Sequence, residues 1–292
     1  MLLFLGWRIL KPIAKLLPRK WSYKAAHILT TAVFWIWPTG RAAMYQNLKF
    51  VLKSDDVRLL RRTSRRQLNR YGEYLVDALL IDQTTPQQCY EAMPTKVWPK
   101  LGALAQKSPI LFALMHFGNW DAGGGAYSYA VGPSHVLVES LGHPSLDKFI
   151  QNGRNKLGMQ TVNIRDGILI ARRALAQQGT LAVLFDRPVP KSDPGVDVLF
   201  FGQKCRIPDG FARIALASQA RVIPLAIARK NPKEFRFSVL IDLDFQYQQS
   251  NDKVNDITLL TQNVLNTYEN WVRLHPDQWY QFRPFFLESQ KI

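Results

Sequence analysis

Apolar and polar positions alternate in regular blocks from about residue 108 to the end of the chain. Short apolar runs rich in β-branched and aromatic residues are separated by longer stretches with the apolar spacing of a helix. The predicted strands cover residues 109–115, 135–138, 161–164, 180–185, 196–201, 222–228 and 235–241. The predicted helices cover residues 144–157, 166–178, 208–220 and 258–274. This alternation predicts an α/β fold with a mainly parallel sheet flanked by helices.

The first third of the chain has a helical pattern instead. Residues 2–17 and 25–37 form two apolar runs, the first interrupted by cations and the second ending in several aromatic side chains. Neither run reaches the roughly 20 apolar residues that cross a bilayer as a helix. Cationic, Trp-containing helices of this kind lie in the headgroup region of a membrane. We therefore expect one continuous domain, with a helical, membrane-docking extension over residues 1–107 and an α/β core over residues 108–292.

These runs have two other interpretations. Amphipathic helices that belong to the core of an ordinary soluble protein would have a similar pattern. A secretory signal peptide is disfavoured, because the charges of the first run lie inside its apolar region and no small-residue cleavage site follows. We expect this segment to be retained.

Positive charge is concentrated in the same part of the chain. Residues 1–70 contain 15 Lys and Arg but only two acids, so they carry +13 of the formal net charge of +16. Such a surface attracts either nucleic acid or an anionic membrane. The arginine-rich residues 53–70 suit nucleic acid, but no recognised nucleic-acid module accompanies them. The apolar runs favour membrane lipids as the partner, without nucleic acid.

Composition limits the remaining classes. At 292 residues, with 47% apolar and 12% aromatic side chains, the chain has enough material for a large core. Its two cysteines, Cys89 and Cys205, have no spacing typical of a metal site or a disulfide framework. We expect no bound metal and a reducing compartment.

The most informative motif is HFGNWD at residues 116–121. It follows the apolar run 109–115 directly and precedes a glycine-rich segment, so His116 and Asp121 stand at the mouth of a buried strand. A basic imidazole steered by a carboxylate is a common arrangement for proton transfer. His and Asp at this spacing are frequent by chance, however, so the motif depends on its context.

Several separate segments then agree with one family. HFGNWD, Arg154 before a Lys-Leu-Gly, and the strand-end pair Asp186 and Arg187 occur in the order seen in the bacterial lipid A biosynthesis acyltransferases. Further matches are Arg41 with Asn47-Leu48, Phe200-Phe201-Gly202, Gly210 with Ala215-Leu216-Ala217, Pro224, and His275-Pro276 with Trp279. The chain resembles this family, which includes the phosphatidylinositol mannoside acyltransferases, along nearly its whole length.

The resemblance implies an O-acyltransferase with a glycerolipid-acyltransferase-like fold and the catalytic residues His116 and Asp121. It further implies a cation at Arg154 that binds donor or acceptor oxygens, although a solvated helix arginine is the alternative. Asp186 and Arg187 are expected to bind substrate, or else to end the strand structurally. We include Gly118 and Asn119 among the binding residues and expect Asn119 to shape the turn.

Residue chemistry is consistent with this activity. An imidazole with an ordinary pKa near 6.5 can remove a hydroxyl proton as the hydroxyl attacks a thioester. We expect His116 to be the general base and Asp121 to hold its ring, with no covalent acyl-enzyme. Backbone amides of the turn at 118–125 are expected to stabilise the oxyanion.

The expected co-substrate is acyl-CoA or acyl carrier protein, with no resident cofactor. The expected acceptor is a membrane glycolipid, either a lipid A precursor or a phosphatidylinositol mannoside-like molecule. With such an acceptor, we expect the protein to act as a monomer at the cytoplasmic face of the plasma (inner) membrane. A glycerophosphate or lysophospholipid acyltransferase is the alternative enzyme, although the Asn before the His and the later Glu-Gly motif of that group are lacking. A non-catalytic basic membrane-binding protein is the alternative from another class.

Overall fold

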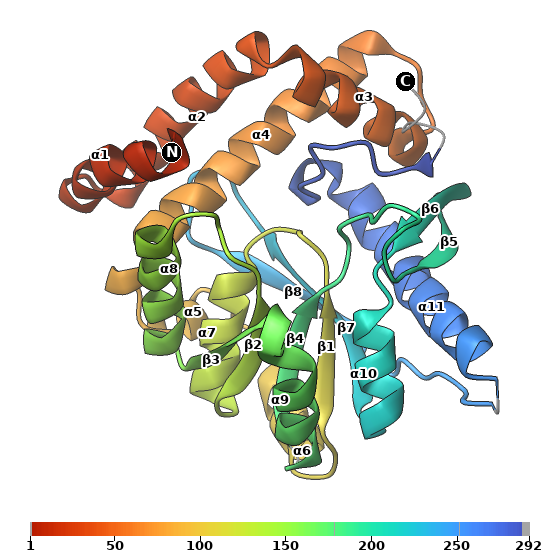
Figure 1. Ribbon diagram of the computed structural model, residues 1–292. Helices are drawn as coiled ribbons and strands as arrows, with labels where there is room; N and C mark the ends of the chain where they lie inside the picture. The colour runs from red at the N-terminus through yellow and green to blue at the C-terminus, as the bar shows by residue number, and fades with distance from the viewer. Residues whose placement is uncertain (1, 178, 251, 288–292) are drawn as a thin grey trace.

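A six-stranded sheet forms the centre of the molecule in the computed structural model, which describes residues 2–177, 179–250 and 252–287 (Figure 1). The strand order is β3-β2-β4-β1-β7-β8. Neighbouring strands are parallel except β7 and β8, which are antiparallel. The strands are β1 (Ile110–Leu114), β2 (Ser134–Val138), β3 (Met159–Asn163), β4 (Thr180–Leu184), β7 (Arg221–Arg229) and β8 (Phe237–Ile241). The predicted α/β class and mainly parallel sheet are confirmed.

Helices cover both faces of this sheet. Because side chains alternate along a strand, Leu111 and Ala113 of β1 belong to one buried cluster while Ile110 and Phe112 belong to the other. The first cluster lies under α9 (Ile164–Ala176), α10 (Gly210–Ser218) and α11 (Lys253–Leu274). The second lies under α5 (Pro86–Glu91), α6 (Val97–Ala105), α7 (Trp120–Ala130) and the end of α8 (Pro144–Lys156). The parallel strands are thus buried on both sides, as their apolar runs predict.

The N-terminal region is helical, as predicted. Its long elements are α1 (Leu2–Leu16), α2 (Arg19–Ile36), α3 (Pro38–Leu52) and α4 (Val57–Leu79), followed by the short 3₁₀ helix η1 (Ile81–Gln83). In Figure 1, α4 crosses above the sheet, and α2 lies along α4 on the side away from the sheet. Among the residues that the structure describes, no helix combines the length and the apolar composition needed to cross a bilayer.

Several predicted elements differ from the structure; helix α11, for example, begins at Lys253, where we predicted residue 258. The predicted strand 196–201 does not enter the central sheet; β5 (Val196–Phe200) pairs antiparallel with β6 (Gln203–Ile207), a strand that we did not predict. Positive φ at Phe201 and Gly202 makes the tight connection between them, which permits a local hairpin. Helix α9 begins at Ile164, where we predicted residue 166, and Gln178, the predicted end of this helix, lies outside the described residues.

The carboxyl edge of the sheet has an opening between β1 and β7. Their ladder ends at Ala113 and Pro224. Beyond this point the buried Tyr268 hydroxyl of α11 forms hydrogen bonds with both strands. It donates to the carbonyl of Ala113, at 3.0 Å, and to that of Leu225, and it accepts from the Met115 amide at 3.2 Å. The chain leaving β1 can then turn away from the sheet, and ligand sites in open α/β sheets form at such carboxyl edges.

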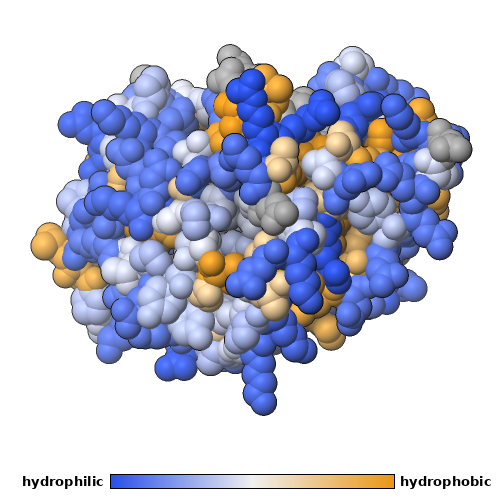
Figure 2. All heavy atoms as spheres, turned by 90° about the horizontal axis from the view of Figure 1, so that it is seen from below, coloured by the Kyte–Doolittle hydropathy of each residue, from blue (hydrophilic) through white to orange (hydrophobic). Residues whose placement is uncertain are grey.

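The opposite edge has a different surface. The face seen from below, where the parallel strands begin, is predominantly hydrophilic with scattered hydrophobic groups (Figure 2). Large exposed apolar side chains are instead frequent on α1 and α2.

Candidate active site

His116 lies two residues beyond the end of β1, and a buried carboxylate lies beside it. The His116 Nδ1 atom is 2.6 Å from Oδ1 of Asp186, and the His116 backbone N–H donates to the same oxygen at 3.0 Å. Sheet register accounts for the pairing: Leu114 of β1 is opposite Leu184 of β4, so the residues two positions further on also meet. Figure 1 shows the two strands side by side.

Asp186 is completely buried and still favours its charged form. Burial by itself raises the pKa of this carboxyl, but the His116 charge and the hydrogen bonds from His116 and Gln281 outweigh burial and lower the pKa. Its second oxygen accepts from Trp279 Nε1 at 3.2 Å and from Gln281 Nε2 at 3.1 Å. Gln281 was not predicted, and Trp279 entered only as part of the resemblance, because neither residue lies near the motif in the chain.

Asp121 has a different partner from the one predicted. Its Oδ1 accepts from Arg154 Nε at 2.7 Å, and its Oδ2 accepts from Tyr74 at 3.0 Å and Arg154 Nη2 at 3.4 Å. The carboxylate that contacts the His116 ring is Asp186, so the predicted His116–Asp121 pairing is wrong. Asp121 is the second residue of α7, and its side chain is directed toward α4 and α8.

Arg154 is correspondingly not a solvated helix arginine. Burial disfavours the charge of its guanidinium, but Asp121 and Tyr74 outweigh burial and raise its pKa. Burial and the nearby Asp121 charge in turn raise the pKa of Tyr74 well above its ordinary range. The Tyr74 hydroxyl and the charged Arg154 thus both contact the Asp121 carboxylate beside the pocket described below.

The tight turn of the motif depends on Gly118. This residue has φ +62°, and a Cβ there would lie 1.8 Å from the carbonyl oxygen of Ile227, so only glycine fits. Asn119 follows as the N-cap of α7: its Oδ1 accepts from the Ala122 amide at 2.9 Å, and its Nδ2 donates to Asp77 at 2.8 Å. Asn119 shapes the turn as predicted, whereas contact of Gly118 or Asn119 with substrate stays a prediction.

Four of the backbone amides at 118–125, where we expected oxyanion donors, are occupied by hydrogen bonds within the protein. The amide of Gly118 donates to Gln278 O at 2.9 Å, and that of Asn119 donates to Ile227 O at 2.9 Å. The Ala122 and Gly123 amides donate to the side chain and carbonyl of Asn119. These four amides are not available as oxyanion donors, because they fasten the turn to β7, to the C-terminal segment and to the helix cap, whereas a role for other amides of this stretch stays a prediction.

An apolar pocket extends from this turn between α7 and the sheet. Trp120, Asp121 and Arg154 line it at the site, together with Met115 and Phe117, the sequence neighbours of His116. The remaining walls come from β1, β2, β3, β4, β7 and α7: Phe112, Leu114, Gly123, Gly124, Tyr127, Ser134, Val136, Leu137, Val138, Met159, Ala182, Leu184, Leu225, Ala226 and Ile227. Helix α7 lies close to the sheet, since a Cβ on Gly124 would be 2.2 Å from the sulfur of Met159.

Aromatic rings surround the other side of His116. The ring centroids of His116 and Trp120 are 5.4 Å apart, and the Trp120 ring lies 4.2 Å from that of Tyr74. Tyr71 of α4 continues the group and contacts Tyr280 of the C-terminal segment at 5.2 Å. Trp120 therefore links the imidazole to aromatic side chains of α4 and of the C-terminal segment.

Arg187 lies at the outer rim. It follows Asp186 at the end of β4 and forms an ion pair with Glu139, which follows β2; both side chains are more than half exposed. The structure thus separates the predicted pair, because Asp186 is directed into the protein and Arg187 toward solvent.

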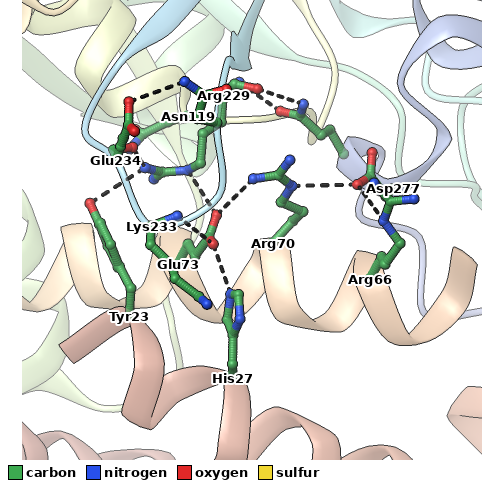
Figure 3. A network of polar contacts seen from close by, with 12 residues as sticks. Tyr23, His27, Arg66, Arg70, Glu73, Asn119, Arg229, Lys233, Glu234 and Asp277 are labelled. Atoms are coloured by element: carbon green, nitrogen blue, oxygen red, sulfur yellow. Dashed lines mark hydrogen bonds and ion pairs between the residues drawn. The ribbon is translucent and has the colours of Figure 1, made fainter. Parts of the chain in front are cut away.

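A buried ionic network joins the helical region to the motif (Figure 3). Arg229 of β7 contacts Glu73 of α4 at 3.1 Å and also pairs with Asp77. Glu73 accepts from His27 of α2 at 2.7 Å, and Asp77 accepts from Asn119 of the turn. Helices α2 and α4 are therefore connected through polar contacts to the turn that carries the motif.

Metal ligation has no support in the described residues, where no three His, Cys, Asp or Glu side chains converge. Both thiols are buried, and burial raises the pKa of Cys89 and of Cys205 to about 12. Neither cysteine is one of the described residues that line the pocket.

A histidine–carboxylate pair beside an apolar pocket, at the carboxyl edge of a mainly parallel sheet, defines an α/β protein equipped for proton transfer next to an apolar ligand. The chain belongs to the bacterial lipid A biosynthesis acyltransferase family, whose model matches residues 1–288. The phosphatidylinositol mannoside acyltransferase of Mycolicibacterium smegmatis is 26% identical over 178 residues, covering 60% of this chain and 55% of that protein. The protein of the same name from Mycobacterium tuberculosis (H37Rv) is 25% identical over 189 residues, covering 63% and 57%. The matches thus span little more than half the length of these relatives.

Proposed function

We propose that this protein transfers a fatty acyl chain from an acyl thioester to a hydroxyl of a membrane glycolipid. The thioester is acyl-CoA or acylated carrier protein, and the acceptor is a lipid A precursor or a molecule like phosphatidylinositol mannoside. The observation that carries the proposal is the pairing of His116 with the buried Asp186 beside an apolar pocket, in a chain of this family.

His116 acts as the general base in this proposal. Because Asp186 contacts Nδ1, it holds the ring in the tautomer whose Nε2 is free to accept the acceptor's hydroxyl proton. The charge of Asp186 then stabilises the imidazolium that forms. Trp279 and Gln281 keep this carboxylate in place by donating to its second oxygen.

Acyl transfer proceeds by direct attack, without an acyl-enzyme. The described lining of the pocket contains no cysteine, and its serine, Ser134, is the first residue of β2, at the strand end away from His116. Both observations favour the acceptor hydroxyl as the nucleophile.

The apolar pocket accommodates the acyl chain. Its walls are mainly aliphatic and aromatic, and Asp121 and Arg154 are the charged residues lining it. Arg154 is held by Asp121 in a fixed position, from which it binds carbonyl or phosphate oxygens. Arg187, at the exposed rim, is placed to bind a charged headgroup.

The N-terminal helices dock on the membrane at its cytoplasmic face. Leu16, Ile28 and Ile36 are 86%, 73% and 78% exposed, and Trp21 and Trp35 are about half exposed. Exposed arginines of α4 adjoin them, since the Arg61 guanidinium lies 6.0 Å from the Trp35 ring. Apolar groups beside cations suit an anionic lipid surface.

Purified protein incubated with labelled palmitoyl-CoA or palmitoylated carrier protein tests this function. Phosphatidylinositol mannosides and lipid A precursors serve as acceptors, with lysophosphatidic acid in a third reaction. Mass spectrometry should find a glycolipid carrying one more acyl chain, and His116→Ala should abolish it.

Other outcomes are equally informative. Acylation of lysophosphatidic acid alone would favour a lysophospholipid acyltransferase. A full yield of product from His116→Ala would contradict the assigned base. Absence of product with both donors and all acceptors would favour a non-catalytic membrane-binding protein.

A further inference from the structure

Trp120 places a hydrogen-bond donor at the site without giving it a partner. It is the first residue of α7, its ring lies edge to face against the His116 ring, and it lines the apolar pocket. Its indole Nε1 atom is buried, and no acceptor within the described part of the chain receives its hydrogen. Trp120 is therefore the side chain that contacts both the imidazole and the pocket with an unused N–H.

The buried Trp98 and Trp279 both use their indole N–H groups in hydrogen bonds. Trp98 donates to the carbonyl of Met93 at 3.2 Å, and Trp279 donates to Asp186 at 3.2 Å. Burying an N–H without an acceptor is unfavourable, so such a group in a native protein requires an explanation. An acceptor supplied by a bound substrate explains it.

Acyl transfer needs such a donor at this place. When an alcohol attacks a thioester, the carbonyl oxygen gains negative charge, and enzymes stabilise it with donors that are oriented in advance. The amides of Gly118, Asn119, Ala122 and Gly123 are all hydrogen-bonded within the protein. The Trp120 indole has no such commitment in the described structure.

We propose that the Trp120 indole N–H donates a hydrogen bond to the thioester carbonyl oxygen of the acyl donor and stabilises the oxyanion that forms there. This inference rests on the proposed function. As the acceptor oxygen bonds to the carbonyl carbon, its proton passes to His116 Nε2, and the carbonyl π electrons move to the oxygen that faces Trp120. When the C=O bond re-forms, the C–S bond breaks, and the thiolate leaves with the proton from His116. Thioester and alcohol become ester and thiol.

Tight packing positions the indole for this contact. Trp120 packs against Tyr74 with ring centroids 4.2 Å apart and ring planes tilted by 39°, and Tyr74 is held by its hydrogen bond to Asp121. The preceding Asn119 fixes the start of the helix through its contacts with Ala122 and Asp77. A donor that is fixed before the reaction needs no reorganisation as charge develops.

Replacing the indole nitrogen alone tests the proposal. Benzothienylalanine, which has sulfur in place of the N–H but a similar ring, is introduced at position 120 of the full chain by stop-codon suppression. With palmitoyl-CoA and phosphatidylinositol mannosides, we expect kcat to fall about 10²–10³-fold, the usual effect of removing one oxyanion donor, with little change in KM. Trp120→Phe should lower kcat similarly.

Benzothienylalanine at position 98 is the matched control. There it removes the hydrogen bond to Met93, so we expect a lower melting temperature and unchanged kcat. At position 120 the same change removes no bond within the protein, so the melting temperature should not fall. This contrast separates a lost transition-state contact from a weakened fold.

The outcomes distinguish this proposal from the function on which it rests. A wild-type protein that transfers no acyl chain from either thioester donor overturns both. If the wild type is active and the position 120 analogue keeps its kcat, only the role of Trp120 is overturned. A rise in KM alone would likewise overturn it and make Trp120 a wall of the pocket.

Discussion

The two carboxylates near His116 differ in the side chains that they contact. Asp186 contacts the imidazole and is fully buried, whereas Asp121 holds Arg154 and Tyr74 at the pocket. Both have aspartate chemistry, but only the first can stabilise an imidazolium directly. Each should therefore affect a different measurable quantity when it is changed to asparagine.

For Asp186→Asn, we expect kcat to fall by about 10³–10⁴-fold, because an amide can no longer stabilise the protonated base or select its tautomer. For Asp121→Asn, we expect a loss of stability of about 3 kcal/mol, since the largely buried Arg154 loses its carboxylate. Steady-state kinetics and urea unfolding of both variants check this. An equal fall in kcat for a stable Asp121→Asn protein would contradict the division of roles.

Gly118 tests the turn itself. In Gly118→Ala, the new Cβ meets the Ile227 carbonyl while φ stays positive, so we expect a destabilisation of about 3 kcal/mol or more. Gly102→Ala is the control, because nothing lies within 4 Å of a Cβ there, and alanine in a helix should be neutral or stabilising by up to about 1 kcal/mol. Similar unfolding midpoints for the two variants would show that the turn is not so constrained.

At the scale of elements, α4 connects the N-terminal helices to the site. Tyr71 and Tyr74 face the aromatic group beside His116, while Glu73 and Asp77 form the ionic network with α2 and β7. The 3.6-residue period of a helix allows these neighbours in sequence to serve different surfaces. The packing of α2 against the rest of the protein and the position of the motif turn thus depend on the same helix, α4.

The network predicts a pH dependence of stability. Burial raises the pKa of Glu73, but contacts with His27, Arg229 and Arg70 outweigh it and lower the pKa below the ordinary 4.5. The ionised Glu73 therefore stabilises the fold above pH 4.5, and this contribution is lost as the pH falls toward the lower folded-state value. Urea unfolding across this acidic range should show a weaker pH dependence for Glu73→Gln than for the wild type. Equal slopes would contradict the role of Glu73.

At the scale of the whole molecule, the site and the exposed apolar helices share one side. Helix α4 crosses above the carboxyl edge of the sheet with α2 along it (Figure 1), whereas the lower face is predominantly hydrophilic (Figure 2). A protein docked through α1 and α2 would bring His116 near the lipid headgroups. The acceptor could then reach the base without leaving the membrane.

Vesicle binding tests this orientation. Changing Trp35 and Ile36 together to serine should weaken binding to anionic vesicles about tenfold, because two exposed apolar groups no longer enter the interface. Changing Val254 and Leu274 of α11, which are 73% and 72% exposed, should have little effect. Co-sedimentation at low and high salt measures both, and added salt should weaken the wild type. Equal losses in the two double variants would contradict a specific docking face.

Much of the architecture could be predicted from the sequence because it is encoded locally. The apolar runs of β1, β4 and β7 and the helical spacing of α8 and α11 are properties of short segments. The motif at 116–121 was predictable as a site for the same reason, since a strand end is visible in the sequence. Pairing of β5 with β6 was not, because the partner strand Gln203–Ile207 is short and largely polar.

By itself, the sequence determined the α/β alternation, the strand-end position of His116, and the cationic, apolar N-terminal region. Only the tertiary structure decided which carboxylate meets the imidazole, because Asp186 is 70 residues away and reaches it through the parallel register of β1 and β4. The same holds for Tyr74, which Asp121 contacts from a distance of 47 residues in sequence. Local patterns specify which face of an element is buried, but the partner of a buried polar group depends on the packing of distant segments.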